Sequence, residues 1–129
     1  MTAELTYLVY SAGLAFALIL TAATLAIREY GGKMLAGTRD SLPPPKNIFL
    51  NRARRTVNNM LENLLLFAII VLAAQAAGVS NAYTVLGAQI FFFARVAFAM
   101  LYIAGVPWLR TLAWLAGVCG TLLIAAQLF

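Results

Sequence analysis

With 129 residues the chain is long enough for one domain, and 64% of its residues are hydrophobic while 10% are charged. This composition excludes an ordinary soluble protein and indicates an integral membrane protein whose first partner is the lipid bilayer. The formal net charge of +5 does not indicate nucleic-acid binding, because the basic residues are not interleaved with aromatic ones.

Four segments are apolar enough to cross a bilayer as helices, which takes about 20 residues each. We expect them at about residues 5–27, 48–77, 83–104 and 108–128. The second segment reaches this length only if it begins near Ile48 and carries the charged residues 52–62 with it. No period-two pattern typical of strands is present. The sequence therefore predicts an all-α membrane protein, with residues 1–129 forming a single bundle of four transmembrane helices.

The connections between these segments differ in length. Residues 78–81 and 105–107 form tight turns, so the last three helices are expected to run antiparallel. The first connection, residues 28–47, is much longer and contains three consecutive prolines, Pro43 to Pro45. Such a connection is either a stiff, solvated tether or a lid over a substrate, and the pattern leaves both readings open.

Charge predicts the orientation of the helices in the membrane. Most of the nine basic residues lie in or beside the first connection: Arg28, Lys33, Arg39, Lys46, Arg52, Arg54 and Arg55. Because basic residues next to spans favour the cytoplasmic side, we expect this connection in the cytoplasm and both termini on the non-cytoplasmic side. The first residues lack a basic stretch, so no cleavable signal peptide is expected.

Polar residues lie within two of the predicted spans. Residues three, four or seven apart share one face of a helix. One stripe on the second helix contains Arg52, Arg55, Asn59 and Glu62, and a second stripe on the third helix contains Arg95, Phe98 and Tyr102. At a rise of about 1.5 Å per residue, Glu62 and Arg95 lie at the same depth. Because an isolated charge in a bilayer is costly, we expect them to form an ion pair facing the bundle interior.

A second polar level lies closer to the basic end of the bundle. The same rise places Asn59, Tyr102 and Arg110 together, with Arg55 slightly beyond them. Guanidinium groups bind carboxylates bidentately, so these residues predict a pocket for a small anion that carries carboxylates. The same side chains would also suit a purely structural role, in which they fasten the helices together, and their spacing does not separate the two readings.

Residue types limit the chemistry further. Histidine is absent, which excludes a metal site built on imidazole, and we predict no metal site. Cys119 is the single cysteine, so no intrachain disulfide is possible, and its apolar surroundings predict a buried, inert thiol. No nucleophile lies beside a base. Any chemistry is therefore expected to come from a bound molecule.

Two stretches resemble one known family. The stretch RARRTVNNMLENLLLF is similar to the second-helix signature of the MAPEG family, the membrane-associated proteins in eicosanoid and glutathione metabolism. The stretch FARVAFAMLYIAGVPWLRTLAW resembles the segment that joins the third and fourth helices of the same family. Leu65 stands where the family often has proline, and Phe98 where some conjugating members have tyrosine. The chain resembles a bacterial-type member, which implies the bacterial inner membrane.

The resemblance also implies an assembly and a ligand. It implies a homotrimer in which glutathione binds between neighbouring subunits near the cytoplasmic face. Arg110 corresponds to the catalytic arginine that activates the glutathione thiol. The residues assigned to glutathione binding are Arg55, Asn59, Glu62, Arg95 and Tyr102.

Two functions follow as hypotheses. The first is a glutathione-dependent transferase or peroxidase that acts on small lipophilic electrophiles arriving through the bilayer. A thiolate stabilised by a nearby arginine is sufficient for such chemistry, because the thiolate is the reactive form. The alternative is a non-catalytic membrane scaffold or accessory subunit of the same fold.

Overall fold

The computed structural model describes all of residues 1–129, and the chain is helical throughout. The helices are α1 (Ala3–Tyr30), α2 (Gly32–Ala36), α3 (Ile48–Ala76), α4 (Ala82–Ala104) and α5 (Pro107–Ala126). All except the short α2 are long and apolar enough to cross a membrane. The predicted class, an all-α membrane protein with four membrane-spanning helices, is confirmed.

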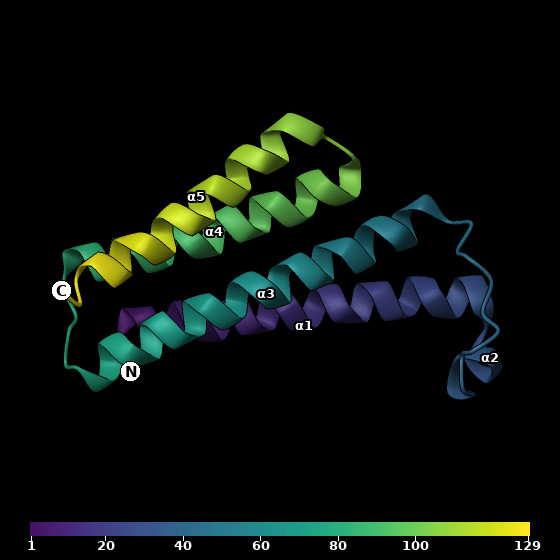
Figure 1. Cartoon of the computed structure of the whole chain (residues 1–129), viewed down its shortest axis with the longest axis horizontal. Coiled ribbons are helices and arrows are strands. Elements are labelled where there is room, and N and C mark those ends of the chain that lie inside the picture. Colours follow the sequence, from purple (N-terminus) through teal and green to yellow (C-terminus); the bar gives the residue numbers. More distant parts are fainter.

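The four long helices form two closely packed pairs. α4 packs most extensively on α5, and α1 packs on α3 (Figure 1). Both termini lie at one end of the molecule, together with the connection between α3 and α4. The first connection, which carries α2, lies at the opposite end with the turn between α4 and α5. Tight turns explain why α3, α4 and α5 follow one another up and down.

Local sequence sets the ends of α4 and the start of α5. The side chain of Asn81 accepts hydrogen bonds from the backbone N–H groups of Tyr83 and Thr84, and the Thr84 hydroxyl accepts one from the backbone N–H of Asn81. This reciprocal capping satisfies donors that a helix start leaves free. α4 ends at Gly105, whose φ of 85° is left-handed and favours glycine. Pro107 then opens α5, where a missing N–H has no consequence.

The first connection is bound to the helix that precedes it. The hydroxyl of Tyr30 donates a hydrogen bond to the carbonyl oxygen of Pro43 over 2.7 Å. The backbone N–H of Lys46 donates to Glu29 Oε1 over 2.6 Å. α2 lies inside this connection and was not predicted. The segment therefore folds back on the end of α1.

At the other end of the bundle, a buried carboxylate links α1 to α4 and to the connection that precedes α4. Glu4, at the start of α1, is 4% exposed and accepts hydrogen bonds from the hydroxyls of Ser80 and Thr84. Ser80 lies in the connection between α3 and α4, and Thr84 lies in the first turn of α4. These bonds hold the beginning of the chain against the other helices.

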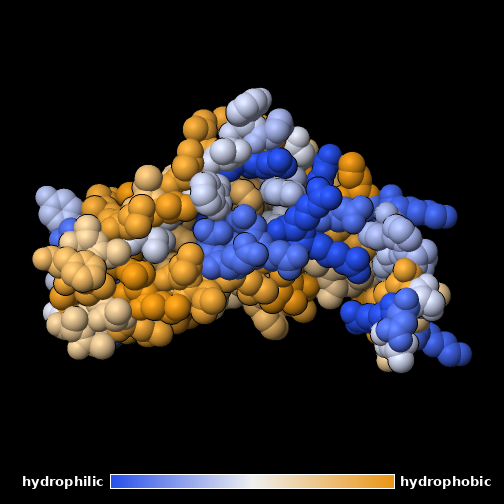
Figure 2. Space-filling model, viewed as in Figure 1, coloured by the Kyte–Doolittle hydropathy of each residue, from blue (hydrophilic) through white to orange (hydrophobic).

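Side chains of aromatic and small residues fill the centre of the bundle. The buried rings of Phe67 on α3 and Phe91 on α4 stack with centroids 3.8 Å apart. Large apolar side chains also cover the outer surface, as expected where lipid replaces water. Hydrophilic residues gather instead in the middle and at one end of the face shown in Figure 2, over α3 and the beginning of α5.

Two glycines allow α4 and α5 to approach closely. A Cβ atom added at Gly120 would lie 2.6 Å from the carbonyl oxygen of Gly87, and one added at Gly87 would lie 2.6 Å from that of Gly120. Gly117, Gly120 and Ile124 are buried and form the face of α5 that packs on α4. Cys119 lies off this face and is exposed, so the expectation of a buried thiol was wrong.

We predict that Gly120→Ala destabilises the protein by about 1–3 kcal/mol, because the new methyl group must push two helix backbones apart. The matched control is Gly13→Ala on α1, where an added Cβ meets nothing within 4 Å. The control should be neutral or slightly stabilising, since alanine favours helix more than glycine does. Thermal unfolding in detergent measures both. Equal midpoints for the two variants would contradict the close contact of α4 and α5.

Candidate functional site

The most deeply buried charge in the molecule is Arg95, on α4. Its side chain is 1% exposed, and its Nη2 donates a hydrogen bond to Asn59 Oδ1 on α3 over 2.5 Å. The guanidinium carbon lies 4.4 Å from the centroid of the Phe98 ring, an arrangement that favours a cation. Gly117 on α5 packs beside this side chain, since a Cβ there would be in ordinary contact with Arg95 Cδ at 3.4 Å.

The ion pair predicted between Glu62 and Arg95 is wrong for the single chain. The partner of Arg95 is the neutral amide of Asn59, and the side chain of Glu62 is exposed on the outside of α3. Equal depth was the basis of the prediction, but depth does not specify the direction in which a side chain points. Glu62 is three residues beyond Asn59, which is about 60° short of a full helical turn. With this rotation the Glu62 side chain is exposed on α3 and forms no ion pair with Arg95.

A second amide holds Asn59 in position. Nδ2 of Asn63, one turn further along α3, donates to the backbone oxygen of Asn59 over 2.8 Å and to its Oδ1 over 3.2 Å. Oδ1 of Asn59 thus accepts from both Asn63 and Arg95, which orients the amide toward the guanidinium. Asn63 was not among the predicted residues, although its spacing of four from Asn59 places it on the same face.

A pocket of about 200 Å³ lies beside this network, between α3, α4 and α5. Its lining residues are Asn59, Phe98, Tyr102, Arg110, Thr111 and Trp114. The guanidinium carbon of Arg110 lies 4.5 Å from the centroid of the Tyr102 ring. The structure therefore brings together Asn59, Tyr102 and Arg110, as their common depth suggested. None of the lining residues is acidic, so positive charge dominates the pocket.

The other predicted site residues lie outside this lining. Arg95 is directly behind the pocket wall, linked to it through Asn59 and Phe98. Arg55 and Glu62 are exposed on α3, on the same polar side of the helix as Asn59. Figure 2 shows a hydrophilic surface over the same helix. Within one chain, the predicted set therefore divides into three pocket residues, one buried arginine and two surface residues.

Two residues of the far wall of the pocket were not predicted from the sequence. Trp114 and Thr111 both come from the first turns of α5. Trp114 is four residues after Arg110, so the two share a helix face. The signal was therefore present in the spacing, but one aromatic residue near a helix start is common in membrane proteins.

The family model described as MAPEG family matches residues 7–129, nearly the whole chain. The chain belongs to the MAPEG family. No match was found among the curated proteins. Membership makes the chain a membrane protein of a family of eicosanoid and glutathione metabolism, as the two stretches around α3 and α4 suggested.

The hydrogen bond between Asn59 and Arg95 is directly testable in this MAPEG protein. We predict that Asn59→Leu lowers stability by about 2–3 kcal/mol, because it removes a hydrogen bond from a buried charged group. Asn58→Leu is the matched control, since Asn58 is the neighbouring amide on α3 and is exposed. Unfolding in detergent provides the measurement, and the control should differ little from wild type.

The double variant Asn59→Leu/Arg95→Met should recover much of this loss, because an apolar pair replaces a polar one. Glu62→Gln should have little effect on stability, since Glu62 does not neutralise Arg95. If the effects of the Asn59 and Arg95 substitutions simply add, the two side chains do not interact in the membrane-embedded protein.

Proposed function

We propose that this MAPEG protein is a glutathione-dependent transferase or peroxidase that acts on small lipophilic electrophiles. The observation that carries the proposal is the pocket that joins Asn59, Tyr102 and Arg110 next to the buried Arg95. Side chains that only fasten helices together need not line a pocket. A site for an anionic ligand, in contrast, requires a pocket with donors such as an arginine, a phenol and an amide.

The donor set suits glutathione, which has two carboxylates, one ammonium group and a thiol. Arg110 and the exposed Arg55 offer forked donors that match carboxylate geometry. Nε and Nη1 of Arg95 have no hydrogen-bond partner in the chain. The positive charge behind the pocket is therefore not neutralised by an acidic side chain, and an anion in the pocket would offset it. Glu62 is the one acid on this face of α3 and suits the ammonium group.

Arg110 is the residue proposed to activate the thiol. A guanidinium within a few ångströms favours the deprotonated form of an acid, and the thiolate is the nucleophile. Arg110 lies in the first turn of α5, where its guanidinium is held against the Tyr102 ring. This contact limits the directions available to a long side chain. The lipophilic partner would reach the thiol from the bilayer, which surrounds the exposed side of α5.

We further propose that the working unit is a homotrimer. Ligand sites usually enclose about 300–1,000 Å³, whereas the pocket within one chain has about 200 Å³. Arg55 and Glu62 lie exposed beside it, so a neighbouring subunit packed on this face would enlarge the site and include both residues. For the membrane, we propose the bacterial inner membrane, with the basic connection in the cytoplasm and both termini outside.

One observation favours the alternative, a non-catalytic scaffold or accessory subunit. Arg95 and Arg52 each connect helices through a hydrogen bond. Arg95 joins α4 to α3, and Nη1 of Arg52 on α3 donates to the carbonyl oxygen of Ile103 on α4 over 3.2 Å. Polar residues of α3 therefore do have a fastening role. The pocket residue Arg110 makes no hydrogen bond of this kind across helices, and its substitution separates the two functions.

We predict that wild-type protein in detergent produces thiolate absorbance when glutathione is added, and that Arg110→Ala abolishes it. Because Arg110 is partly exposed and lies in the first turn of α5, Arg110→Ala should leave folding and oligomer size nearly unchanged. Arg110→Lys should restore part of the signal, because a point charge still favours the thiolate although the planar fork is lost. Ultraviolet difference spectroscopy measures the signal.

Arg55→Ala is the matched control, because it removes the same charge from α3 outside the pocket lining. It should weaken glutathione binding while leaving the thiolate signal at saturation. A fully active Arg110→Ala variant would remove the catalytic assignment. If the wild type itself gives no thiolate signal and no protection from thermal unfolding at millimolar glutathione, the scaffold function takes its place.

A further inference from the structure

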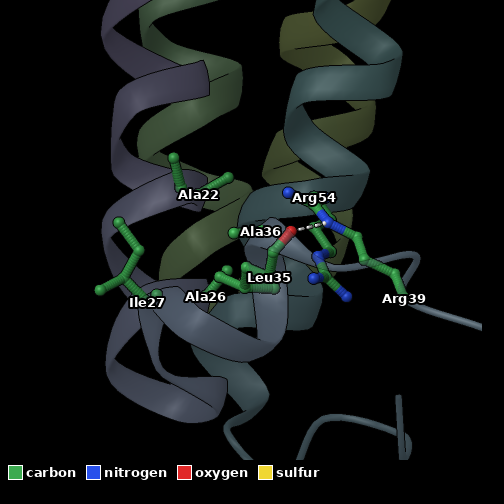
Figure 3. Close-up of a pocket in the computed structure, with 9 residues that line it drawn as sticks. Ala22, Ala26, Ile27, Leu35, Ala36, Arg39 and Arg54 are labelled. Carbon is green, nitrogen blue, oxygen red and sulfur yellow. Dashed lines mark hydrogen bonds between the residues drawn. The ribbon is translucent and has the colours of Figure 1, made fainter. Parts of the chain in front are cut away.

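A second pocket, of about 450 Å³, lies at the basic end of the bundle, away from the candidate site. It is bordered by the end of α1, by α2 and by Arg54 of α3 (Figure 3). Its wall on α1 consists of small or apolar residues, Ala22, Ala23, Ala26 and Ile27. Leu35 and Ala36 of α2 form a further apolar side. The pocket thus depends on the first connection, whose helix α2 forms one side of it.

Two arginines line the side of the pocket opposite α1. Arg54 comes from α3 and Arg39 from the connection after α2, and Figure 3 shows both side chains on that side. Nε of Arg39 donates to the carbonyl oxygen of Leu35 over 2.8 Å. The Arg54 guanidinium carbon lies 5.9 Å from the centroid of the Tyr30 ring. None of the lining residues is acidic, so two positive charges share one pocket without a carboxylate.

The backbone of Arg39 has an unusual conformation, which indicates that the position of this residue is defined by its surroundings. Arg39 is the one residue other than glycine with a positive φ, at 65°. The left-handed region is unfavourable for a residue with a side chain, and it persists only where the surrounding structure holds it. The side chain of Arg39 is held by its bond to Leu35, and the same connection is bound to Tyr30 and Glu29 further along, at Pro43 and Lys46.

We propose that this pocket binds an anionic phospholipid. Arg39 and Arg54 hold the phosphate, and the beginning of an acyl chain lies along the alanine wall of α1. Guanidinium groups bind phosphate oxygens through paired hydrogen bonds, which explains two arginines on one side. A phosphate between them would also relieve the repulsion of their like charges.

The apolar wall favours a lipid over a soluble phosphate compound. Ala22 to Ile27 are the last residues of the first predicted span, and they cover about 7 Å along the helix axis. The pocket therefore begins among the basic residues at the membrane border and continues toward the hydrocarbon region. A soluble anion would gain nothing from contact with an apolar wall. A phospholipid fits both parts of the pocket, because its charged headgroup lies at the membrane border and its apolar chains extend into the hydrocarbon. The proline-containing connection then has a role, which is to hold Arg39 over the headgroup.

The proposal can be tested by native mass spectrometry of the intact protein released from neutral detergent. We expect wild type to retain phosphatidylglycerol in preference to phosphatidylcholine of the same chain length. Arg39→Ala/Arg54→Ala should weaken phosphatidylglycerol binding about tenfold or more, since each basic residue near an anionic lipid contributes about fivefold. Arg28→Ala/Lys33→Ala is the matched control. It removes two charges from the same end of the bundle but not from the pocket, and it should bind as wild type does.

Two further experiments test the role of the apolar wall. Ala23→Trp fills the pocket from the exposed side of α1 without a change in charge, and it should also weaken phosphatidylglycerol binding. This variant keeps the test decisive if the double arginine variant does not fold. Excess inorganic phosphate should not displace the lipid. Equal losses in the two double variants would show diffuse charge attraction, and an unaffected Ala23→Trp or effective competition by phosphate would show a soluble-anion site. Each of these outcomes would overturn the proposal.

Discussion

The arrangement of α3, α4 and α5 depends on one constraint, the presence of a guanidinium in the interior of a membrane-spanning bundle. A charge at such a depth is costly unless polar groups surround it. Arg95 meets this requirement in part, through the amide of Asn59 and the face of the Phe98 ring, while its Nε and Nη1 have no hydrogen-bond partner in the chain. Asn63 in turn orients Asn59. The same residues that accommodate the charge also form one wall of the pocket beside it, so the packing of the three helices and the candidate site share one origin.

Hydropathy and charge predicted the four spans because a bilayer leaves few alternatives to uninterrupted helices. The rise per residue also placed Asn59, Tyr102 and Arg110 at one level, and they do line one pocket. Depth alone did not specify in which direction around the helix axis a side chain points. Glu62 has the right depth to meet Arg95, but it points outward, and the neutral Asn59 takes its place. A charge pair was the expected solution, whereas the chain uses an amide and an aromatic ring. Cys119 shows the same limit, since an apolar neighbourhood in sequence did not reveal which side of α5 packs on α4.

The contacts hardest to predict join residues distant in sequence at the two ends of the bundle. Glu4 accepts hydrogen bonds from Ser80 and Thr84 at one end, and no local pattern in the first residues indicates them. At the other end, the connection with the three prolines is neither a free tether nor an open lid. It is tied to Glu29 and Tyr30, and it brings Arg39 to the same pocket as Arg54. Basic residues that were predicted to mark orientation thus also have defined structural positions. Arg39 lines a pocket, and Arg52 on α3 donates a hydrogen bond to the end of α4.

The proposed ligand of the positive pocket beside Arg95 is glutathione, bound through its carboxylates. Calorimetric titration of the wild-type protein in detergent tests this proposal most directly, with glutathione in one experiment and its serine-containing analogue in the other. We predict that both ligands bind with millimolar or tighter dissociation constants, because both carry the carboxylates, while the contact of Arg110 with the thiol favours glutathione over its analogue. If neither ligand binds at millimolar concentration, the pocket does not receive the carboxylates of glutathione. If glutathione alone binds, the thiol and not the carboxylates provides the affinity.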